Sequence, residues 1–478
     1  MGKFHRSVGL IIIGLAAMAA GLLWWVMAVG DRAVGTAPTD GVIFGLWKVL
    51  YSPDAPTLQV TLAAVSLAVL FAAGVALLDR RITDRSRRSD DPIDLPLAPK
   101  IIMADTEGIF AGPVRVTVLI PAHNEEASLP LTLSSLRSQS VPPDRIIVVT
   151  DNCADRTAEV AQRAGAEVFA SVDNDQKKAG ALNQVLKVVL PGQGDNDLVM
   201  VMDADTALDD GFLEAAVRRM TGDRALLAIG GLFYGETGSG LLGQFQRNEY
   251  TRYAREVQRR RGKVFVLTGT ASLFRPVALR TVAASRGSKI PGIPGDVYDT
   301  NALTEDNELT IALRSLGALM ISPSECTVVT EVMPTWQALW AQRLRWQRGA
   351  LENLGAYGTT PQTFRYWAQQ LGIGYGVISL SSYFFLIVLM VLSLNSWVWF
   401  PFWIGLGLIF IVERVVTVWR GGWAARLLGL TLFPELLFAT FLNVVYLKGI
   451  VDISLGRTAG WQHVIQLAPG PLTVGDNR

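Results

Sequence analysis

Long uncharged stretches flank a polar block in this chain. Val8–Gly30 and Leu58–Leu78 precede the block, and Leu371–Leu392 and Trp397–Val412 follow it around the short turn Ser393–Ser396. The first two stretches are each long enough to cross the roughly 30 Å of a bilayer's hydrocarbon core. The pattern predicts an integral membrane protein in which two helical hairpins enclose a folded polar domain.

Positive charges at the ends of these stretches predict the topology. Lys3 and Arg6 precede the first stretch, and a cluster of arginines at 80–88 follows the second. By the positive-inside rule both flanks are cytoplasmic, so Asp31–Thr57 is expected outside. A signal peptide is the alternative for the first stretch, but its apolar run is too long and shows no obvious small-residue cleavage site. We therefore expect a multi-pass protein of the cell (plasma) membrane with its polar domain in the cytoplasm.

A fifth apolar stretch, Leu427–Leu447, leaves its relation to the membrane open. Pro434 and Glu435 lie in its middle, and an ionisable residue at bilayer depth is costly unless it faces protein or water. The stretch either crosses the membrane beside a polar path or lies at the interface. Lys448 and Arg457, which follow it, favour a cytoplasmic tail.

Within the polar block, short β-rich runs alternate with helical periodicity. This alternation predicts an α/β domain with a mostly parallel sheet and right-handed crossovers. The predicted strands are Val114–Ile120, Arg145–Thr150, Ala166–Ala170 and Leu198–Met202, and the predicted helices lie around Ser128–Leu136, Thr157–Ala164 and Lys178–Val189. The predicted organisation is an N-terminal membrane hairpin at 1–78, a charged linker at 79–110, the α/β domain at 111–334, amphipathic interface helices at 335–370, membrane helices at 371–450 and a tail at 451–478.

Composition narrows the classes of function. The chain has 478 residues, 50% of them hydrophobic, and 43 Lys and Arg against 42 Asp and Glu, so no global basic field favours nucleic acid. The two cysteines, Cys153 and Cys326, cannot build a disulfide framework. The three histidines lie far apart in the sequence, without metal-ligand spacing. The glycine-rich motif of P-loop ATPases, G-x-x-x-x-G-K-[ST], is also missing from the sequence.

The candidate chemistry lies where strands are expected to end. Asp203 and Asp205 follow the apolar strand Leu198–Met202, at the sheet edge where α/β proteins bind ligands. Two carboxylates are hard oxygen ligands that suit Mg²⁺ or Mn²⁺ bound to a diphosphate. Thr304-Glu305-Asp306 supplies further carboxylates later in the chain. These features indicate a site for a nucleotide-activated substrate, with a solvated acidic loop as the alternative.

A series of motifs between Val114 and Gly355 resembles a known family. In chain order the motifs are PAHNEE, DNCADRT, KAGALN, MDADT, TGTASLFR, TEDNELT and QRLRW. The series resembles the membrane-embedded family 2 glycosyltransferases, the group of cellulose, chitin and hyaluronan synthases, and is most similar to bacterial poly-N-acetylglucosamine synthases. The resemblance implies a GT-A-like nucleotide-diphospho-sugar transferase fold, inserted between transmembrane helices.

The resemblance also implies how the donor is bound. Asp151 is expected to accept hydrogen bonds from uracil, and Lys178 to bind the diphosphate. Asp203 and Asp205 are expected to hold the Mn²⁺ or Mg²⁺ that bridges the two phosphates, with Asp203 also at the substrate. Further substrate-binding residues implied by the resemblance are Ala122, Asn124, Glu125 and Gly269. Structural roles remain the alternative: a turn-capping Asp151 and a solvated Lys178.

The last two motifs, TEDNELT and QRLRW, imply which residues bind and activate the acceptor. By resemblance Asp306 is the catalytic base, with Glu305 beside it, although Thr304 could instead begin an acid-capped helix. Gln342, Arg345 and Trp346 are expected to bind substrate from an amphipathic helix at the membrane face. The alternative is an interfacial anchor without a catalytic role.

Together these features imply an inverting, processive transfer of a sugar, N-acetylglucosamine, from a UDP-sugar to a growing glycan. A non-processive enzyme that adds one sugar to a lipid carrier or cell-envelope glycan is the main alternative, and a catalytically silent membrane scaffold is another. The expected partners are the UDP-sugar, a glycan or lipid-linked acceptor, the lipid bilayer and a small membrane subunit, without nucleic acid.

Overall fold

The computed structural model describes residues 39–43, 47–51, 77, 113–223, 226–260, 262–392 and 401–457. The chain divides into two compact units, one formed by 82–363 with 458–478 and the other by 1–81 with 364–457. The predicted helices Val8–Gly30 and Leu58–Leu78, the linker at 79–110 and the turn Ser393–Ser396 lie outside the described residues, apart from residue 77. The unit boundary falls inside the predicted block of interface helices at 335–370.

A seven-stranded sheet forms the centre of the first unit. Its strand order is β11-β8-β10-β6-β3-β4-β5. All neighbouring pairs are parallel except those that involve β10. The strands are β3 (Val116–Ala122), β4 (Arg145–Thr150), β5 (Glu167–Ala170), β6 (Leu198–Met202), β8 (Leu226–Gly230), β10 (Ala271–Phe274) and β11 (Leu319–Ile321). The predicted mostly parallel sheet is confirmed, with β10 as an antiparallel strand that the sequence pattern did not indicate.

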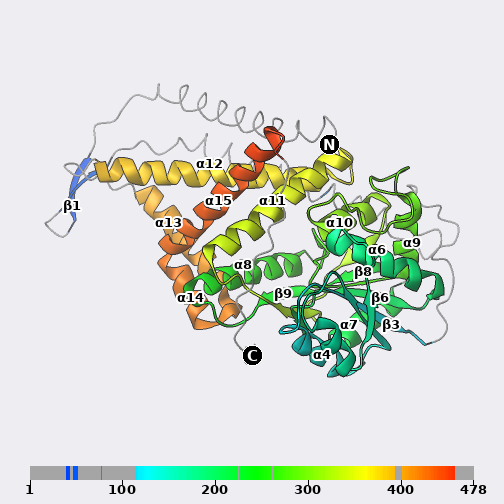
Figure 1. Ribbon diagram of the computed structural model, residues 1–478. Helices are drawn as coiled ribbons and strands as arrows, with labels where there is room; N and C mark the ends of the chain where they lie inside the picture. The colour runs from blue at the N-terminus through cyan, green and yellow to red at the C-terminus, as the bar shows by residue number, and fades with distance from the viewer. Residues whose placement is uncertain are drawn as a thin grey trace. The chain divides into compact units, whose positions relative to one another are not determined.

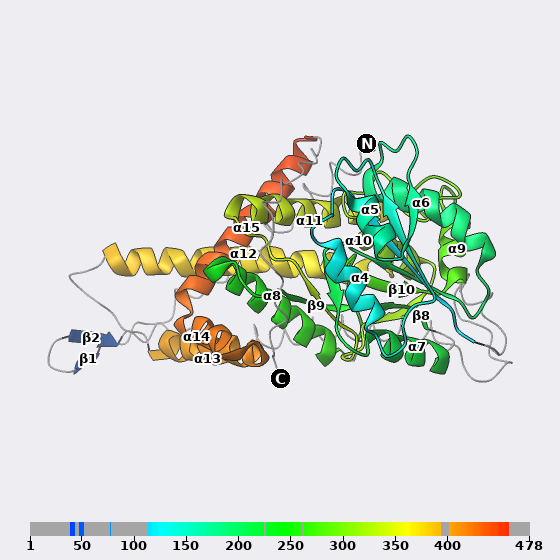
Figure 2. The same cartoon turned by 60° about the horizontal axis from the view of Figure 1, so that its bottom comes forward.

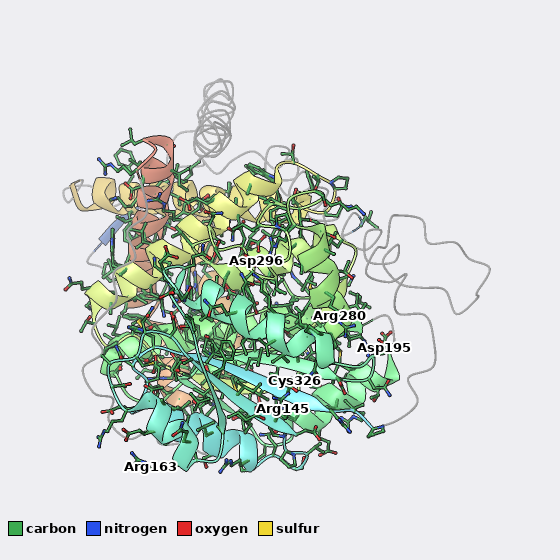
Figure 3. The ribbon with its side chains drawn as sticks, turned by 45° about the vertical axis from the view of Figure 1, so that its right-hand side comes forward. Arg145, Arg163, Asp195, Arg280, Asp296 and Cys326 are labelled. Carbon is green, nitrogen blue, oxygen red and sulfur yellow. The ribbon has the colours of Figure 1, made fainter. Side chains whose placement is uncertain are left out.

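The central strands could be predicted from the sequence because both faces of the sheet are buried, which makes these strands continuous apolar runs. Every residue of β3 and β6 is buried, as parallel strands covered by helices on both sides require. Figure 1 shows α6 and α9 on one side of the sheet and α7 on the other. At the start of β4, Arg145 (labelled in Figure 3) donates two hydrogen bonds to Glu167 of β5, at 2.9 and 2.8 Å. This forked ion pair fixes the register at the end of the sheet away from the candidate residues.

The helices of this unit are α4 (Leu129–Arg137), α5 (Thr157–Arg163), α6 (Lys177–Val189) with the 3₁₀ turn η1 (Leu190–Gly192), α7 (Phe212–Gly222), α8 (Gly240–Arg259), α9 (Pro276–Ser285), α10 (Glu305–Ser315) and α11 (Trp336–Tyr357). Three of them, α4, α5 and α6, begin and end close to the predicted positions. Thr335 caps α11, since its side chain accepts a hydrogen bond from the Ala338 N–H at 3.2 Å. Helices α10 and α11 contact one another and lie side by side in both views (Figure 1, Figure 2).

A small second sheet lies beyond the end of β6. It has the strand order β7-β12-β9, formed by β7 (Thr206–Leu208), β12 (Thr327–Thr330) and β9 (Leu232–Gly235). Thr330 pairs with Thr206, which directly follows Asp205. The pairing therefore brings the residue after β12, Glu331, to the acidic motif.

Helix α11 differs from the amphipathic interface helix that the sequence predicts. Its buried residues include two arginines, Arg343 and Arg348, whereas Trp336 is 47% exposed. The arginines are buried because carboxylates pair with them: Glu249 with Arg343 at 2.9 Å and Glu352 with Arg348 at 2.6 Å. The inward face of this helix is thus partly ionic.

The second unit contains the C-terminal helices. They are α12 (Phe364–Leu392), α13 (Pro401–Thr417), η2 (Trp419–Gly421), α14 (Gly422–Thr431) and α15 (Phe433–Ser454), and the antiparallel strands β1 (Thr39–Ile43) and β2 (Trp47–Tyr51) belong to the same unit. Among the described residues, α15 is the one helix long and apolar enough to span a membrane.

The stretch Leu427–Leu447, whose relation to the membrane the sequence leaves open, is divided between the two helices α14 and α15. The chain breaks at Leu432, whose φ of 51° ends α14, and Pro434 lies in the first turn of α15. A first-turn proline sacrifices no helical hydrogen bond. Glu435 is 3% exposed, and its carboxylate lies 3.9 Å from Arg414. The buried carboxylate therefore has a cationic partner within its own unit.

Candidate active site

Three adjacent parallel strands bring Ala122, Asp151 and Asp203 to one edge of the sheet. Ala122 ends β3, and the other two directly follow β4 and β6. The Asp151 N–H donates to the Ala122 carbonyl at 2.9 Å. These residues lie together because the carboxyl ends of adjacent parallel strands meet at one edge of the sheet.

Asp151 is held in one orientation. It is 7% exposed, and its Oδ1 accepts hydrogen bonds from Ser171 Oγ at 2.6 Å and from Asn174 Nδ2 at 2.8 Å. The next residue, Asn152, has a φ of 50°, so the chain turns sharply there. A buried, oriented carboxylate fits both the predicted contact with a base and the alternative of a turn stabiliser.

Asn124 and Glu125 connect the loop after β3 to its surroundings. Asn124 has a φ of 58°, and its Oδ1 accepts from the Ala154 N–H at 2.7 Å. The Glu125 carboxylate accepts a hydrogen bond from the Ser128 hydroxyl. Burial raises the pKa of Glu125, and the nearby carboxylate of Asp203 adds to the rise. Glu125 thus belongs to the electrostatic surroundings of the Asp203 motif.

Lys178 joins two of the predicted motifs. It is the second residue of α6, and its Nζ lies 2.6 Å from Asp203 Oδ1 and 2.9 Å from Glu305 Oε1. Burial alone would lower the pKa of Lys178, but these carboxylates raise it well above its ordinary value. The lysine is therefore a fixed positive charge between the end of β6 and the start of α10.

Gly269 lies where this cluster is most crowded. A Cβ on this residue would come within 3.0 Å of Lys178 Nζ and 3.2 Å of Asp203 Oδ2. Its N–H donates to Asp306 Oδ2 at 3.1 Å. A side chain at this position would have to displace the lysine or the carboxylate slightly, so glycine suits the close approach of the backbone to both groups.

The two carboxylates at the start of α10 have different proton affinities. Burial raises the pKa of Asp306 to about 6, and the neighbouring Glu305 contributes to the rise. Burial would also raise the pKa of Glu305, but Lys178 and, more weakly, Arg345 bring it below the ordinary value. One carboxylate is thus permanently charged, whereas the other can exchange a proton near neutral pH, as general bases do.

This difference predicts a pH-dependent stability for the metal-free protein. Asp306 has a pKa raised to about 6 in the fold, so its protonated form is favoured there and its stabilising contribution is lost as pH rises from about 4 through 6. Asp306→Asn should therefore match the wild type near pH 4 and become more stable at pH 8, by up to about 3 kcal/mol. Unfolding midpoints at the two pH values, with a chelator present, test this. A variant equally stable or less stable at pH 8 would contradict it.

Asp203 and Asp205 lie among other acidic groups. Burial and the carboxylates of Asp203 and Glu331 raise the pKa of Asp205 well above its ordinary value. Burial raises the pKa of Glu331 to about 7. Within the part of the chain that the structure describes, no group of three or more His, Cys, Asp or Glu side chains is arranged as a metal-binding set. Mg²⁺ and Mn²⁺ with a nucleotide need only one or two protein carboxylates, because phosphate and water complete the coordination. The pair therefore fits a cation that arrives with a diphosphate.

A pocket lies directly below these groups. It is lined by Lys178, Gly269, Tyr298, Glu305 and Asp306, with apolar side chains of the sheet behind them. Asn183, from the same motif as Lys178, fixes the pocket wall: its Oδ1 accepts from the Tyr298 N–H at 2.9 Å, and its Nδ2 donates to the Tyr298 carbonyl at 2.9 Å.

The QRLRW motif lies on α11, the helix that contacts α10. The Arg343 guanidinium lies 4.2 Å from the centroid of the Trp346 ring and so covers one ring face. The Gln342 side chain accepts from Arg343 Nη1 at 3.0 Å. Burial lowers the pKa of Lys177, and the nearby charge of Arg345 lowers it further. Arg345 is thus electrostatically close to the start of α6 as well as to Glu305.

Sequence reasoning missed three residues of this site. Glu331, Tyr298 and Arg343 were not singled out, although two of them, Glu331 and Arg343, have a detectable signal in retrospect. Glu331 follows the apolar run Thr327–Thr330, as Asp203 follows β6, and Arg343 lies inside the QRLRW motif. Tyr298 has no such signal, because only the fold brings its loop under Lys178.

Comparisons with known proteins indicate the family that the chain resembles. Residues 117–282 match the family model described as "Glycosyl transferase family 2". The chain is 28% identical over 262 residues to a poly-beta-1,6-N-acetyl-D-glucosamine synthase of Staphylococcus aureus, a match that covers 54% of this chain and 58% of the relative. The corresponding synthase of Staphylococcus epidermidis is 27% identical over 245 residues, covering 50% and 55%. The chain thus matches little more than half the length of these curated relatives.

Solved structures show more distant likenesses. A mannosyltransferase from Pyrobaculum calidifontis, in complex with GDP-Man and Mn²⁺, is 17% identical with a TM-score of 0.47, covering 82% of this chain and 98% of that one. Glucosyl-3-phosphoglycerate synthase from Mycobacterium tuberculosis, in complex with Mn²⁺, UDP and glucosyl-3-phosphoglycerate, is 17% identical with a TM-score of 0.35, covering 57% and 88%.

Proposed function

Because the chain carries a family 2 glycosyltransferase domain, we propose that it transfers N-acetylglucosamine from a UDP-sugar to a growing glycan, with inversion at the anomeric carbon. The observation that carries the proposal is the arrangement around Lys178, whose ammonium group lies within 2.9 Å of both Asp203 and Glu305. This contact joins the strand end suited to a diphosphate with the helix that carries Asp306. In the proposed function, the sugar to be transferred lies between the diphosphate and Asp306.

On the acceptor side, Asp306 removes a proton. It accepts the hydrogen of the acceptor hydroxyl while that oxygen attacks the anomeric carbon and the bond to the diphosphate breaks. The pKa of about 6 makes this carboxylate a stronger base than an ordinary aspartate. Attack opposite the leaving group inverts the carbon, so one base suffices and no covalent nucleophile is needed.

On the donor side, the residues at the strand ends hold the nucleotide. Asp151 accepts from the uracil ring, and Lys178 places a positive charge at the diphosphate. Asp203 and Asp205 would hold the Mn²⁺ or Mg²⁺, which would neutralise charge on the departing diphosphate. Ala122, Asn124, Glu125 and Gly269 shape the loops around the donor.

A panel of UDP-sugars tests this function. Full-length protein in membranes is incubated with each donor and a divalent cation, and UDP release and product composition are measured. We expect turnover with UDP-N-acetylglucosamine above the other sugars. UDP release from none of them would leave the silent-scaffold alternative, and preference for another sugar would correct the substrate.

We propose that the enzyme is processive, with Gln342, Arg345 and Trp346 at the acceptor. The similarity to relatives named as poly-beta-1,6-N-acetyl-D-glucosamine synthases supports this proposal. Arg343 covers one face of the Trp346 ring, and we propose that a sugar of the acceptor stacks on the other face. Transfer of one sugar to a lipid carrier or cell-envelope glycan is the competing function.

Product size separates these two functions. Trp346→Ala should leave UDP affinity within about twofold but shorten or abolish the polymer, because stacking on an aromatic face contributes about 1 kcal/mol or more. Trp346→Phe, which keeps an aromatic face, should retain part of the length. Trp336→Ala, on the same helix and with its ring 47% exposed, is the matched control. Sizing by gel or mass spectrometry decides, and a wild type that adds a single sugar would exclude processivity.

We further propose a multi-pass plasma-membrane enzyme whose catalytic domain faces the cytoplasm, where UDP-sugars are available. The apolar helix α15 supports a membrane location, and the arginines at 80–88 support the orientation. The bilayer would receive the growing glycan, and a small membrane subunit would assist. Protease accessibility of the catalytic domain in sealed vesicles tests the orientation.

A further inference from the structure

One face of α11 packs against the first turn of α10. Gly349, Asn353 and Tyr357 follow one another at four-residue spacing, which places them on a single helix face. Each of the three approaches a residue between Thr304 and Glu308. This face therefore meets the turn that carries Glu305 and Asp306.

Gly349 makes the closest of these approaches. A Cβ on this residue would lie 2.4 Å from Thr304 Oγ1 and 2.8 Å from Thr304 Cγ2. Neither atom can move away freely, because Thr304 is 5% exposed and directly precedes the helix. Any side chain at position 349 must therefore push the two helices apart.

Asn353 holds the same turn by hydrogen bonds. Its Nδ2 lies 3.1 Å from the Thr304 carbonyl, 3.2 Å from Thr304 Oγ1 and 3.0 Å from Asn307 Oδ1. All three residues are buried, at 3%, 5% and 9% exposure. Thr304 and Asn307 flank the pair Glu305-Asp306, so the amide donates to the backbone and side chain of the residue before the carboxylates and to the side chain of the residue after them.

The third residue of this face, Tyr357, contacts Glu308 of α10. Tyr357 donates to Glu308 Oε1 at 2.5 Å, and Arg286 forms a forked ion pair with the same carboxylate, at 2.5 and 2.7 Å. The guanidinium and the carboxylate are 0% and 2% exposed. A buried pair of this kind breaks only at high cost, so the lower part of the helix contact is rigid.

Arg345 lies one helical turn before Gly349 on the same face. Its charge acts on Glu305. A change in the separation of α10 and α11 therefore changes the distance between the QRLRW motif and the carboxylates.

We propose that Gly349 and Asn353 are positioning residues that set the distance between the QRLRW motif and the Glu305-Asp306 pair. The inference rests on the proposed function, in which the acceptor lies between that motif and Asp306. It assigns catalytic importance to two residues that touch neither donor nor acceptor.

The test is a rescue experiment with full-length protein. Gly349→Ala should lower kcat about a hundredfold, as misplacement of reacting groups by about 1 Å does, with UDP affinity changed less than about threefold. Thr304→Ala removes the two atoms that the new methyl group meets, so the double variant Gly349→Ala with Thr304→Ala should recover most of the rate. Asn353→Ala, which adds no bulk, should lower kcat about tenfold at unchanged UDP affinity.

Hydrogen exchange gives a readout that does not depend on activity. Amides at 305–308 should exchange faster in Gly349→Ala and Asn353→Ala and return towards wild type in the double variant. Gly222→Ala is the matched control, because a Cβ at that helical glycine meets nothing within 4 Å. An inactive wild type with this exchange pattern would refute the proposed function alone. Full activity of Gly349→Ala, equal loss of donor affinity and kcat, or no rescue by Thr304→Ala would overturn the positioning role.

Discussion

Replacing Asp306 with asparagine should lower the turnover number by roughly 10²–10⁴-fold, the usual contribution of a general base, while UDP-sugar affinity stays nearly unchanged. The amide keeps the size of the carboxylate and can still accept a hydrogen bond from the Gly269 N–H, which now lies 3.1 Å from Asp306 Oδ2. It cannot take the proton of the acceptor hydroxyl. Single-turnover kinetics with a saturating donor measure the chemical step directly.

Glu305→Gln is the comparison that identifies the base. Glu305 lies 2.9 Å from Lys178, so its loss should disturb the charge next to the diphosphate and affect donor binding as well as rate. A large loss of turnover in Glu305→Gln, with Asp306→Asn still active, would show that the base is the other carboxylate.

Asp203→Ala and Asp205→Ala should each abolish the effect of Mn²⁺ on UDP binding. The two carboxylates end β6, and the pKa of Asp205 is raised by burial and by Asp203, so a cation relieves a repulsion that is present in the fold. Loss of one ligand should weaken metal-dependent UDP binding about a hundredfold or more, or about 2.8 kcal/mol. Lys178 would remain for the phosphates, so weak metal-independent binding should persist.

Calorimetry with UDP, with and without Mn²⁺, measures this effect. Asp210→Ala is the matched control, since Asp210 is an exposed carboxylate a few residues further along the same segment. Unchanged metal-dependent affinity in both the Asp203 and Asp205 variants would remove these residues from the metal site.

Much of this fold could be predicted from the sequence because the central strands are buried on both faces. β4 and β6 have the predicted bounds. A short, mostly apolar run inside a polar domain indicates a strand that is covered by helices on both faces. Because neighbouring strands are parallel, the residues at their carboxyl ends could then be predicted to lie together. The antiparallel strand β10 could not be predicted in this way, because its direction depends on the path of the long segment that precedes it.

Contacts between distant segments account for the remaining errors. Glu331 meets Asp205 only through the pairing of β12 with β7, which no local pattern specifies. From the sequence alone, Arg343 is indistinguishable from a solvated surface charge. In the fold its guanidinium lies 2.9 Å from the carboxylate of Glu249 on α8. The break at Leu432 has a different reason: the apolar pattern of Leu427–Leu447 continues through it, so the sequence pattern does not mark it.

The pairing of β7 with β12 also bears on how the chain folds during synthesis. The hydroxyls of Thr206 and Thr330 lie 3.4 Å apart although 124 residues separate them in sequence. Closing so long a loop is slow, and a nascent chain that ends before β12 leaves the edges of β7 and β9 open. We therefore expect chains truncated before residue 327 to aggregate rather than to accumulate as soluble, inactive domains.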